Sequence, residues 1–269
     1  MKKNYSDTGV GIFAYNRPSH LKRLFISLSN HDLKNLYVFL DGPKTALDKV
    51  NQDEIKIMIQ NYPRKIKLIK RKKNLGLKRA ISYGVNYLSK KHKKIIIIED
   101  DCIPFRNFFN FFNISFRLME KDHQIEAICA YQHPNLSNKL KKYVNLKMNL
   151  FIPWGWGTLS SNWIKFQNYK ENLILPKIYN NLKIKKNKKK TIWSLNYISY
   201  MYQKNKKCIY PSHSMIKNIG FDGSGVNSKN SNLFRVLENR IKLNSDCIYK
   251  KSISEYQKRF FKNKLNFFY

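Results

Sequence analysis

Four consecutive isoleucines, Ile95 to Ile98, run directly into Glu99, Asp100 and Asp101. An uninterrupted apolar run of this kind is typical of a strand that is buried on both faces, as the strands of a parallel sheet are. In open α/β sheets ligands bind beyond the carboxyl ends of the strands, so the three acids stand where a cation and an anionic substrate would meet. The run therefore favours an α/β fold and makes the triplet a candidate metal site.

The triplet also has a structural interpretation, because Asp101 could cap a helix that follows it. The chain holds 17 Asp and Glu residues against 52 Lys and Arg residues, so three adjacent acids are unusual in it. This scarcity favours the metal site. Because side chains alternate along a strand, we expect Glu99 and Asp101 to point one way and Asp100 the other.

The length of 269 residues and the hydrophobic content of 42% predict a globular protein with one substantial core, in one or two domains. No apolar run is long enough to span a membrane, and the first seven residues lack the apolar region of a signal peptide, so we expect a cytoplasmic location. The cysteines are widely spaced, which predicts reduced structural thiols. The chain has four of them, Cys102, Cys129, Cys208 and Cys247.

The formal net charge of +35 raises the alternative of a nucleic-acid-binding protein. Lys, Asn and Ile are all abundant and have codons rich in A and T, so genomic base composition explains part of the excess, and we expect no specific nucleic acid partner. The basic runs at residues 64–73, 90–94 and 183–190 are typical of solvated faces. They would also favour peripheral contact with the anionic inner face of a membrane.

Strands and helices are predicted to alternate in the first half of the chain. The strands fall at residues 8–15, 36–40, 66–69 and 95–98, and the helices around residues 21–28, 47–59 and 77–88. This alternation predicts a mostly parallel sheet with right-handed crossovers.

The pattern loosens after the acids. We expect an aromatic-rich helix at residues 105–119, a strand at 125–131, a polar connection to residue 150, a helix at 192–202, a short strand at 208–210 and a glycine-rich loop at 220–225. Four phenylalanines at helical spacing are predicted to be core residues: Phe108, Phe109, Phe112 and Phe116.

Five segments of the chain, taken in order, match a known pattern. They are FAYNRP at residues 13–18, the Asp41-Gly42 pair, NLGL at residues 74–77, the acidic triplet and PWGWG at residues 153–157. They resemble the GT-A glycosyltransferases, in particular bacterial family-2-like enzymes related in pattern to eukaryotic N-acetylglucosaminyltransferase I. A sixth segment, NIGFDGSG at residues 218–225, resembles the loop that follows in the bacterial members.

The resemblance implies an α/β, Rossmann-like GT-A fold in which helices flank a mostly parallel central sheet. It implies a single domain at residues 1–231, with a nucleotide-binding half at about 8–131 and a smaller acceptor-side half at about 150–231, followed by a basic, aromatic extension at 232–269. The implied activity is metal-dependent, inverting transfer of a sugar from a nucleotide diphosphate sugar, a UDP-sugar, to a glycan or lipid-linked acceptor in bacterial surface polysaccharide biosynthesis.

The resemblance also implies roles for individual residues. Asp101 would hold Mn²⁺ or Mg²⁺, a hard cation that carboxylate oxygen suits, and the chain has no Cys or His cluster that would indicate zinc. Asp100 would contact the ribose or donor sugar, and Asp41 would accept a hydrogen bond from uracil, although Asp-Gly-Pro is also an ordinary turn sequence. The donor-binding residues implied as a set are Ala14, Asn16, Arg17, Asp41, Asn74, Gly76, Arg79, Asp100, Trp154 and Trp156. For the two tryptophans a buried structural role is the alternative.

An inverting enzyme needs a general base to accept the proton of the acceptor hydroxyl. Relatives carry an acid just before the tryptophan that corresponds to Trp193, but this chain reads KKTI at residues 189–192. Asp222, the one acid inside the 218–225 segment, is the candidate base, and His213 is a weaker alternative. The missing acid also leaves open a degraded transferase that binds donor without transfer.

Overall fold

The computed structural model describes residues 7–134, 145–176, 192–223, 236 and 249–250. The strands are β1 (Thr8–Ala14), β2 (Leu36–Leu40), β3 (Ile66–Lys70), β4 (Lys94–Glu99), β5 (Cys102–Pro104), β6 (Ile125–Cys129), β7 (Asn145–Met148), β8 (Trp156–Leu159), β9 (Lys207–Tyr210), β10 (Ile216–Asn218) and β11 (Tyr249–Lys250). The helices are α1 (Pro18–Leu28), α2 (Ala46–Gln60), α3 (Leu77–Ser89), α4 (Phe108–Lys121), α6 (Ser160–Gln167) and α8 (Trp193–Gln203).

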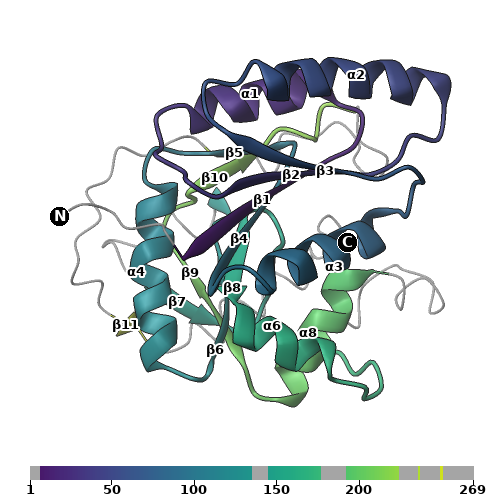
Figure 1. Ribbon diagram of the computed structural model, residues 1–269. Helices are drawn as coiled ribbons and strands as arrows, with labels where there is room; N and C mark the ends of the chain where they lie inside the picture. The colour runs from purple at the N-terminus through teal and green to yellow at the C-terminus, as the bar shows by residue number, and fades with distance from the viewer. Residues whose placement is uncertain (1–6, 135–144, 177–191, 224–235, 237–248, 251–269) are drawn as a thin grey trace.

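The described strands form one large mixed sheet and one small sheet. The large sheet has the order β11-β7-β9-β6-β8-β4-β1-β2-β3, and β5 pairs with β10 separately. Helices flank the large sheet, with α1 and α2 above it, α4 on the left and α3, α6 and α8 at the lower right in Figure 1. This arrangement is the mostly parallel, Rossmann-like α/β fold that the sequence predicts.

The first half of the chain follows the predicted alternation closely. β1 lies between β2 and β4, parallel to both, so that Ile12 pairs with Val38 on one side and Ile98 on the other. Every residue of β1 and β2 is buried, and the four isoleucines of β4 are 0% exposed. Burial on both faces explains why these strands are mostly apolar. The parallel pairing of β1 and β4 places their carboxyl ends side by side, with Phe13 opposite Glu99.

The sheet changes direction beyond β4. β8 runs antiparallel to both β4 and β6, with Ile97 opposite Trp156. The aromatic helix α4 packs its predicted phenylalanines into the core at 0–1% exposure, which confirms their assignment. Helix α4 begins at Phe108 rather than at residue 105, because residues 102–104 form strand β5, which pairs with β10.

Several short elements differ from the sequence prediction. The predicted connection before residue 150 contains β7, the PWGWG segment leads into β8, and α6 follows at once. The predicted tail from residue 232 lies largely outside the described residues, but the backbone of Tyr249 and Lys250 pairs with β7. None of the helices in the described ranges is long and apolar enough to cross a bilayer.

Candidate functional site

The acidic triplet meets Arg17 at the carboxyl end of β4. Strand β4 ends at Glu99, and Asp100 and Asp101 form the turn that follows it. One guanidinium nitrogen of Arg17 donates to a carboxylate oxygen of Asp100 and lies 2.9 Å from Oδ2 of Asp101. The expectation that Asp100 and Asp101 point apart is therefore wrong, because side-chain alternation holds only within the strand and both acids lie beyond its end.

The pKa values of these groups reflect their crowding. Burial raises the pKa of Asp100 to about 6, and Asp101 adds to the rise while Arg17 opposes it. Burial and the two neighbouring carboxylates raise the pKa of Glu99 to about 8. Burial lowers the pKa of the Arg17 guanidinium, but the attraction of Asp100 and Asp101 outweighs it and leaves that pKa above its ordinary value. Arg17 thus remains the fixed positive charge of the site.

Asp101 has the chemistry and access that a single-carboxylate metal site requires. Its side chain is 13% exposed, so it can be reached from solvent, whereas Asp100 is 4% exposed. Gly220 passes so close to Oδ2 of Asp101 that a Cβ there would overlap it, and the Ile219 amide donates to the Asp101 carbonyl at 2.8 Å. The described residues contain no group of three His, Cys, Asp or Glu side chains able to hold a metal by themselves. A hard cation would therefore share Asp101 with ligand oxygens or water.

Asp101 does not cap a helix, because α4 begins only at Phe108. Its carboxylate instead accepts a long contact from the thiol of Cys102, at 3.4 Å, and the ion pair with Arg17. The structural alternative raised by the sequence is thereby removed.

Asp41 anchors the loop that leads into α3. Its two carboxylate oxygens accept hydrogen bonds from the backbone amides of Gly42, Leu75 and Gly76, at 2.9 to 3.0 Å. The side chain is buried in doing so. These bonds use most of the accepting capacity of the carboxylate. The predicted contact with uracil stays a prediction, and the structure adds a positioning role to it.

The same loop explains two glycines. A Cβ on Gly42 would overlap the backbone of Lys73 and Asn74, so the two loops can approach closely only with glycine there. Gly76 is the N-cap of α3 with φ of 76°, a left-handed conformation that favours glycine. Asn74 ties the loops together, since its amide donates to the Gly42 carbonyl at 2.9 Å and its oxygen accepts from Gly76 at 3.1 Å.

Asp48 fixes the segment between β1 and α1. Its carboxylate accepts hydrogen bonds from the Tyr15 hydroxyl and the Asn16 amide, both at 2.6 Å, and from the Thr45 amide at 3.0 Å. The hydrogen bond from Tyr15 is the largest of the effects that hold the pKa of Asp48 below its usual range. Asn16 is thus occupied by Asp48, and the pair sets the direction from which Arg17 reaches the acids.

The remaining predicted donor residues differ in their access. Ala14 is buried at the end of β1, and Arg79 is exposed on α3. Trp156 is 0% exposed within an aromatic cluster that includes Trp193, with ring centroids 5.3 Å apart, so it is a core residue that no donor can touch without rearrangement. Trp154 packs edge-on against Phe221 at 5.3 Å, which places it beside the 218–223 segment.

The candidate base Asp222 reaches the site through a histidine. Oδ2 of Asp222 lies 3.1 Å from Nε2 of His20, and the Asp222 side chain is 46% exposed whereas that of His20 is 6% exposed. Burial, and after it the charge of Arg17, lowers the pKa of His20. The alternative, His213, is half-buried with Nδ1 3.1 Å from the Ser212 hydroxyl. Of the two candidates, Asp222 has a described contact with the residues around Arg17.

Sequence reasoning missed His20 and Asp48 as parts of this region. His20 carries a weak signal, since it lies in the first turn of α1, three residues after Arg17, the residue that precedes the helix. Asp48 follows Thr45 at capping-box spacing, which predicts its role at the α2 terminus but not its bonds to Tyr15 and Asn16. Gly220 lies in the predicted 218–225 segment, but its close approach to Asp101 was not predicted.

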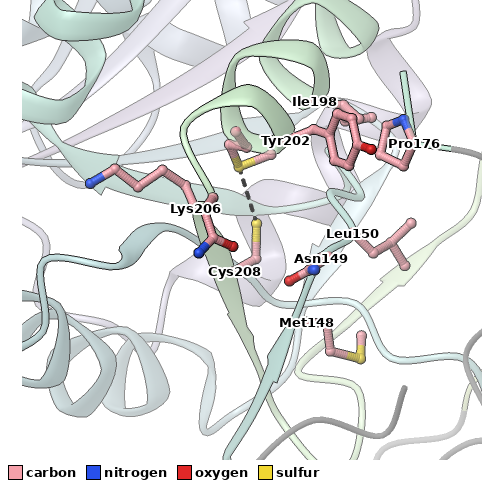
Figure 2. Close-up of a pocket in the computed structure, with 10 residues that line it drawn as sticks. Met148, Asn149, Leu150, Pro176, Ile198, Tyr202, Lys206 and Cys208 are labelled. Atoms are coloured by element: carbon pink, nitrogen blue, oxygen red, sulfur yellow. Dashed lines mark hydrogen bonds between the residues drawn. The ribbon is translucent and has the colours of Figure 1, made fainter. Parts of the chain in front are cut away.

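The cysteines are free and buried wherever the structure describes them, namely Cys102, Cys129 and Cys208. Cys208 lines a cavity of about 80 Å³ (Figure 2). Its sulfur lies 3.6 Å from that of Met201. Burial raises the pKa of the Cys208 thiol well above its usual range, so the thiol stays protonated. These residues fit the predicted structural role.

Comparison with known proteins identifies part of this fold. Residues 10–112 match the profile of a family described as "Glycosyl transferase family 2", and that segment contains most of β1, all of β2 to β4, Arg17, Asp41 and the acidic triplet. No curated protein sequence matches the chain.

Among solved structures, the chain is similar to the mannosyltransferase PcManGT from Pyrobaculum calidifontis in complex with GDP-Man and Mn²⁺. The two sequences are 12% identical and the TM-score is 0.42. The alignment covers 57% of this chain and 44% of PcManGT. The chain is also similar to S. aureus TarS 1-349, at 11% identity and a TM-score of 0.48, covering 78% of this chain and 59% of that one. The chain thus spans less than two thirds of either structure, and likenesses at this level add no argument about activity.

Proposed function

We propose that this chain, a glycosyltransferase of the GT-A fold, is a metal-dependent inverting enzyme that moves a sugar from a UDP-sugar to a glycan or lipid-linked acceptor of bacterial surface polysaccharide. The observation that carries the proposal is the convergence of Arg17, Asp100 and Asp101 at the end of β4, beside the loop that Asp41 anchors. The family match over residues 10–112 supports nucleotide-sugar transfer in general. The metal, the stereochemistry, the nucleotide and the pathway are our proposals.

The nucleotide would lie between the end of β1 and the loop before α3. Asp41 holds that loop by its Leu75 and Gly76 amides, so the backbone around Asn74 has a fixed shape before ligand arrives. Such preorganisation lowers the entropy lost on binding. The buried carboxylate of Asp100 would accept hydrogen bonds from the hydroxyl groups of the ribose or the donor sugar.

The diphosphate would lie over Asp101 and Arg17. A divalent cation held by Asp101 would supply positive charge to the departing diphosphate when bound, and Mn²⁺ or Mg²⁺ suits a carboxylate ligand with phosphate oxygens and water. Arg17 supplies a permanent positive charge at the same place, because its guanidinium already lies within 2.9 Å of Asp101.

Asp222 would act as the base. The acceptor oxygen attacks the anomeric carbon from the face opposite the diphosphate, a bond to the acceptor forms, and the bond to the diphosphate oxygen breaks with its electron pair leaving on the diphosphate. The proton of the acceptor hydroxyl passes to the Asp222 carboxylate. The half-exposed Asp222 side chain suits contact with an incoming acceptor, and the buried His20 behind it suits a positioning role.

A donor screen followed by a transfer assay tests this function. Nucleotide sugars are screened for thermal stabilisation with Mn²⁺ and with a chelator, since a ligand that binds only the folded state raises its apparent stability. We expect a UDP-sugar to stabilise the protein only with the metal. Mass spectrometry of the products then separates transfer from binding alone, and activity that survives Asp222→Asn unchanged would reject Asp222 as the base.

A further inference from the structure

A cavity of about 350 Å³ lies between α3, α6 and α8, away from the acidic triplet. Figure 1 shows these three helices grouped on one side of the sheet. The volume falls in the range of about 300–1,000 Å³ that small-molecule sites occupy, whereas the cavity beside Cys208 is far below it. The site proposed above for the donor uses none of the residues that line this cavity.

The lining of the cavity combines aromatic and polar side chains. Trp163 and Trp193 are buried and line it together with Phe166 and Tyr169. The polar lining comes from Ser82, Gln167 and Asn196, with Lys78 and Lys170. A ligand that fits this lining has an apolar face for the partly exposed rings of Phe166 and Tyr169 and hydroxyl groups for the amides, which is the chemistry of a sugar ring.

The charge in the cavity favours an anion. Glu171 is the acid among the lining residues, and its carboxylate is occupied by Lys204, at 3.0 Å, and by the Tyr169 hydroxyl, also at 3.0 Å. Lys78 and Lys170 contribute two positive charges to the wall. The first turns of α3 and α8, which supply Lys78 and Trp193, contain no acidic residue that would repel a negative ligand.

The cavity adjoins the donor segment along the chain. Lys78 is two residues from Gly76, whose amide donates to Asp41, so the first turn of α3 connects the Asp41-anchored loop with the cavity wall. A sugar held in this cavity would lie on the α3 side of the donor.

We propose that the α3–α6–α8 cavity binds an acidic sugar, a hexose that carries a carboxylate or phosphate group, and that this sugar is a unit of the acceptor glycan. The identification with the acceptor rests on the proposed function. The binding of the acidic sugar rests on the cavity alone.

Binding of glucuronate and glucose 6-phosphate to the full chain tests the proposal, with glucose and inorganic phosphate as reference ligands. Titration calorimetry gives the dissociation constants, and tryptophan fluorescence reports occupancy because Trp163 and Trp193 line the cavity. The double variant Lys78→Ala/Lys170→Ala is expected to weaken acidic sugar binding by about tenfold or more, the effect of losing charge-assisted contacts. Lys165→Ala, an exposed lysine of α6 outside the cavity, is the matched control and should leave binding unchanged.

Three results would overturn the proposal: the double variant binds like the wild type, Lys165→Ala weakens binding equally, or inorganic phosphate binds as tightly as the acidic sugars. Asp101→Asn separates this proposal from the previous one. Acidic sugar binding that survives in Asp101→Asn, while Mn²⁺-dependent donor binding is lost, would support both proposals. Acidic sugar binding by a wild type that binds no nucleotide sugar would support the cavity and reject the proposed donor. Loss of acidic sugar binding in Asp101→Asn would place these ligands at the donor site and reject the cavity.

Discussion

The buried carboxyl group of Glu126 should make the stability of this protein fall as the pH rises. Glu126 lies on β6 and is 1% exposed, with the Tyr197 hydroxyl 3.3 Å from Oε1 and no partner for Oε2 among the described residues. Burial raises its pKa from 4.5 to about 7, against the opposing charges of Lys206 and Lys165 and the hydrogen bond from Tyr197. The folded protein therefore retains the proton over a pH range in which the unfolded chain has lost it.

The size of the effect follows from the two pKa values. Their difference of about 2.5 pKa units corresponds to roughly 3 kcal/mol at 1.36 kcal/mol per unit. Because the folded-state pKa is the higher one, this contribution to the free energy of unfolding is fully present below pH 4.5 and is lost as the pH rises to about 7. Above about pH 7 the ionisation of Glu126 no longer changes the free energy of unfolding.

Comparison of the wild type with Glu126→Gln isolates this group. The glutamine keeps the shape of the side chain but cannot ionise, so the difference between the two free energies of unfolding should change by about 3 kcal/mol between pH 4.5 and pH 8, in favour of the variant at the higher pH. Urea unfolding at several pH values measures it, and the melting temperatures should diverge by roughly 6 to 10 °C. Parallel pH profiles for the two proteins would refute the assignment of a raised pKa to Glu126.

Two further substitutions probe the site itself. Gly220→Ala places a Cβ against the Asp101 carboxylate, so Mn²⁺-dependent donor binding should weaken by about tenfold. Circular dichroism should show an unchanged fold. Unaltered donor affinity would contradict the close approach of Gly220 to Asp101. Asp41→Asn removes a charged acceptor from the Leu75 and Gly76 amides, so their hydrogen exchange should accelerate and donor affinity fall by about tenfold or more. Wild-type exchange rates at both amides would show that Asp41 does not hold the loop.

The inner strands β1, β2 and β4 could be predicted from the sequence because they are mostly apolar and largely buried. Burial on both faces leaves no ambiguity about which residues face inward, and the observed bounds of β2 coincide with the predicted ones. The short strands β5, β7, β8 and β10 could not be predicted in the same way. Each has three or four residues, too few to show a periodicity, and each is fixed by pairing with a distant segment.

The site was predicted as a set of residue types but not as a set of contacts. The positions of Asp41, Asp101 and Arg17 at the ends of strands follow from local pattern. Their partners do not, because Asp41 bonds to a loop 34 residues away and Arg17 to acids 83 and 84 residues away. Only the assembled sheet brings such groups together, and for the same reason the sequence could not show that Trp156 is 0% exposed whereas its neighbour Trp154 is 8% exposed.

The most direct test of the account is donor binding by Asp101→Asn. With a UDP-sugar at a hundred times its dissociation constant, the wild type should gain roughly 2.7 kcal/mol of stability in the presence of Mn²⁺, a shift of several degrees in melting temperature. Asp101→Asn should lose this metal-dependent gain, and Asp53→Asn, which changes an exposed acid of α2, should keep it. Full Mn²⁺-dependent stabilisation of Asp101→Asn would contradict the assignment of the acids after β4 as the donor's metal site.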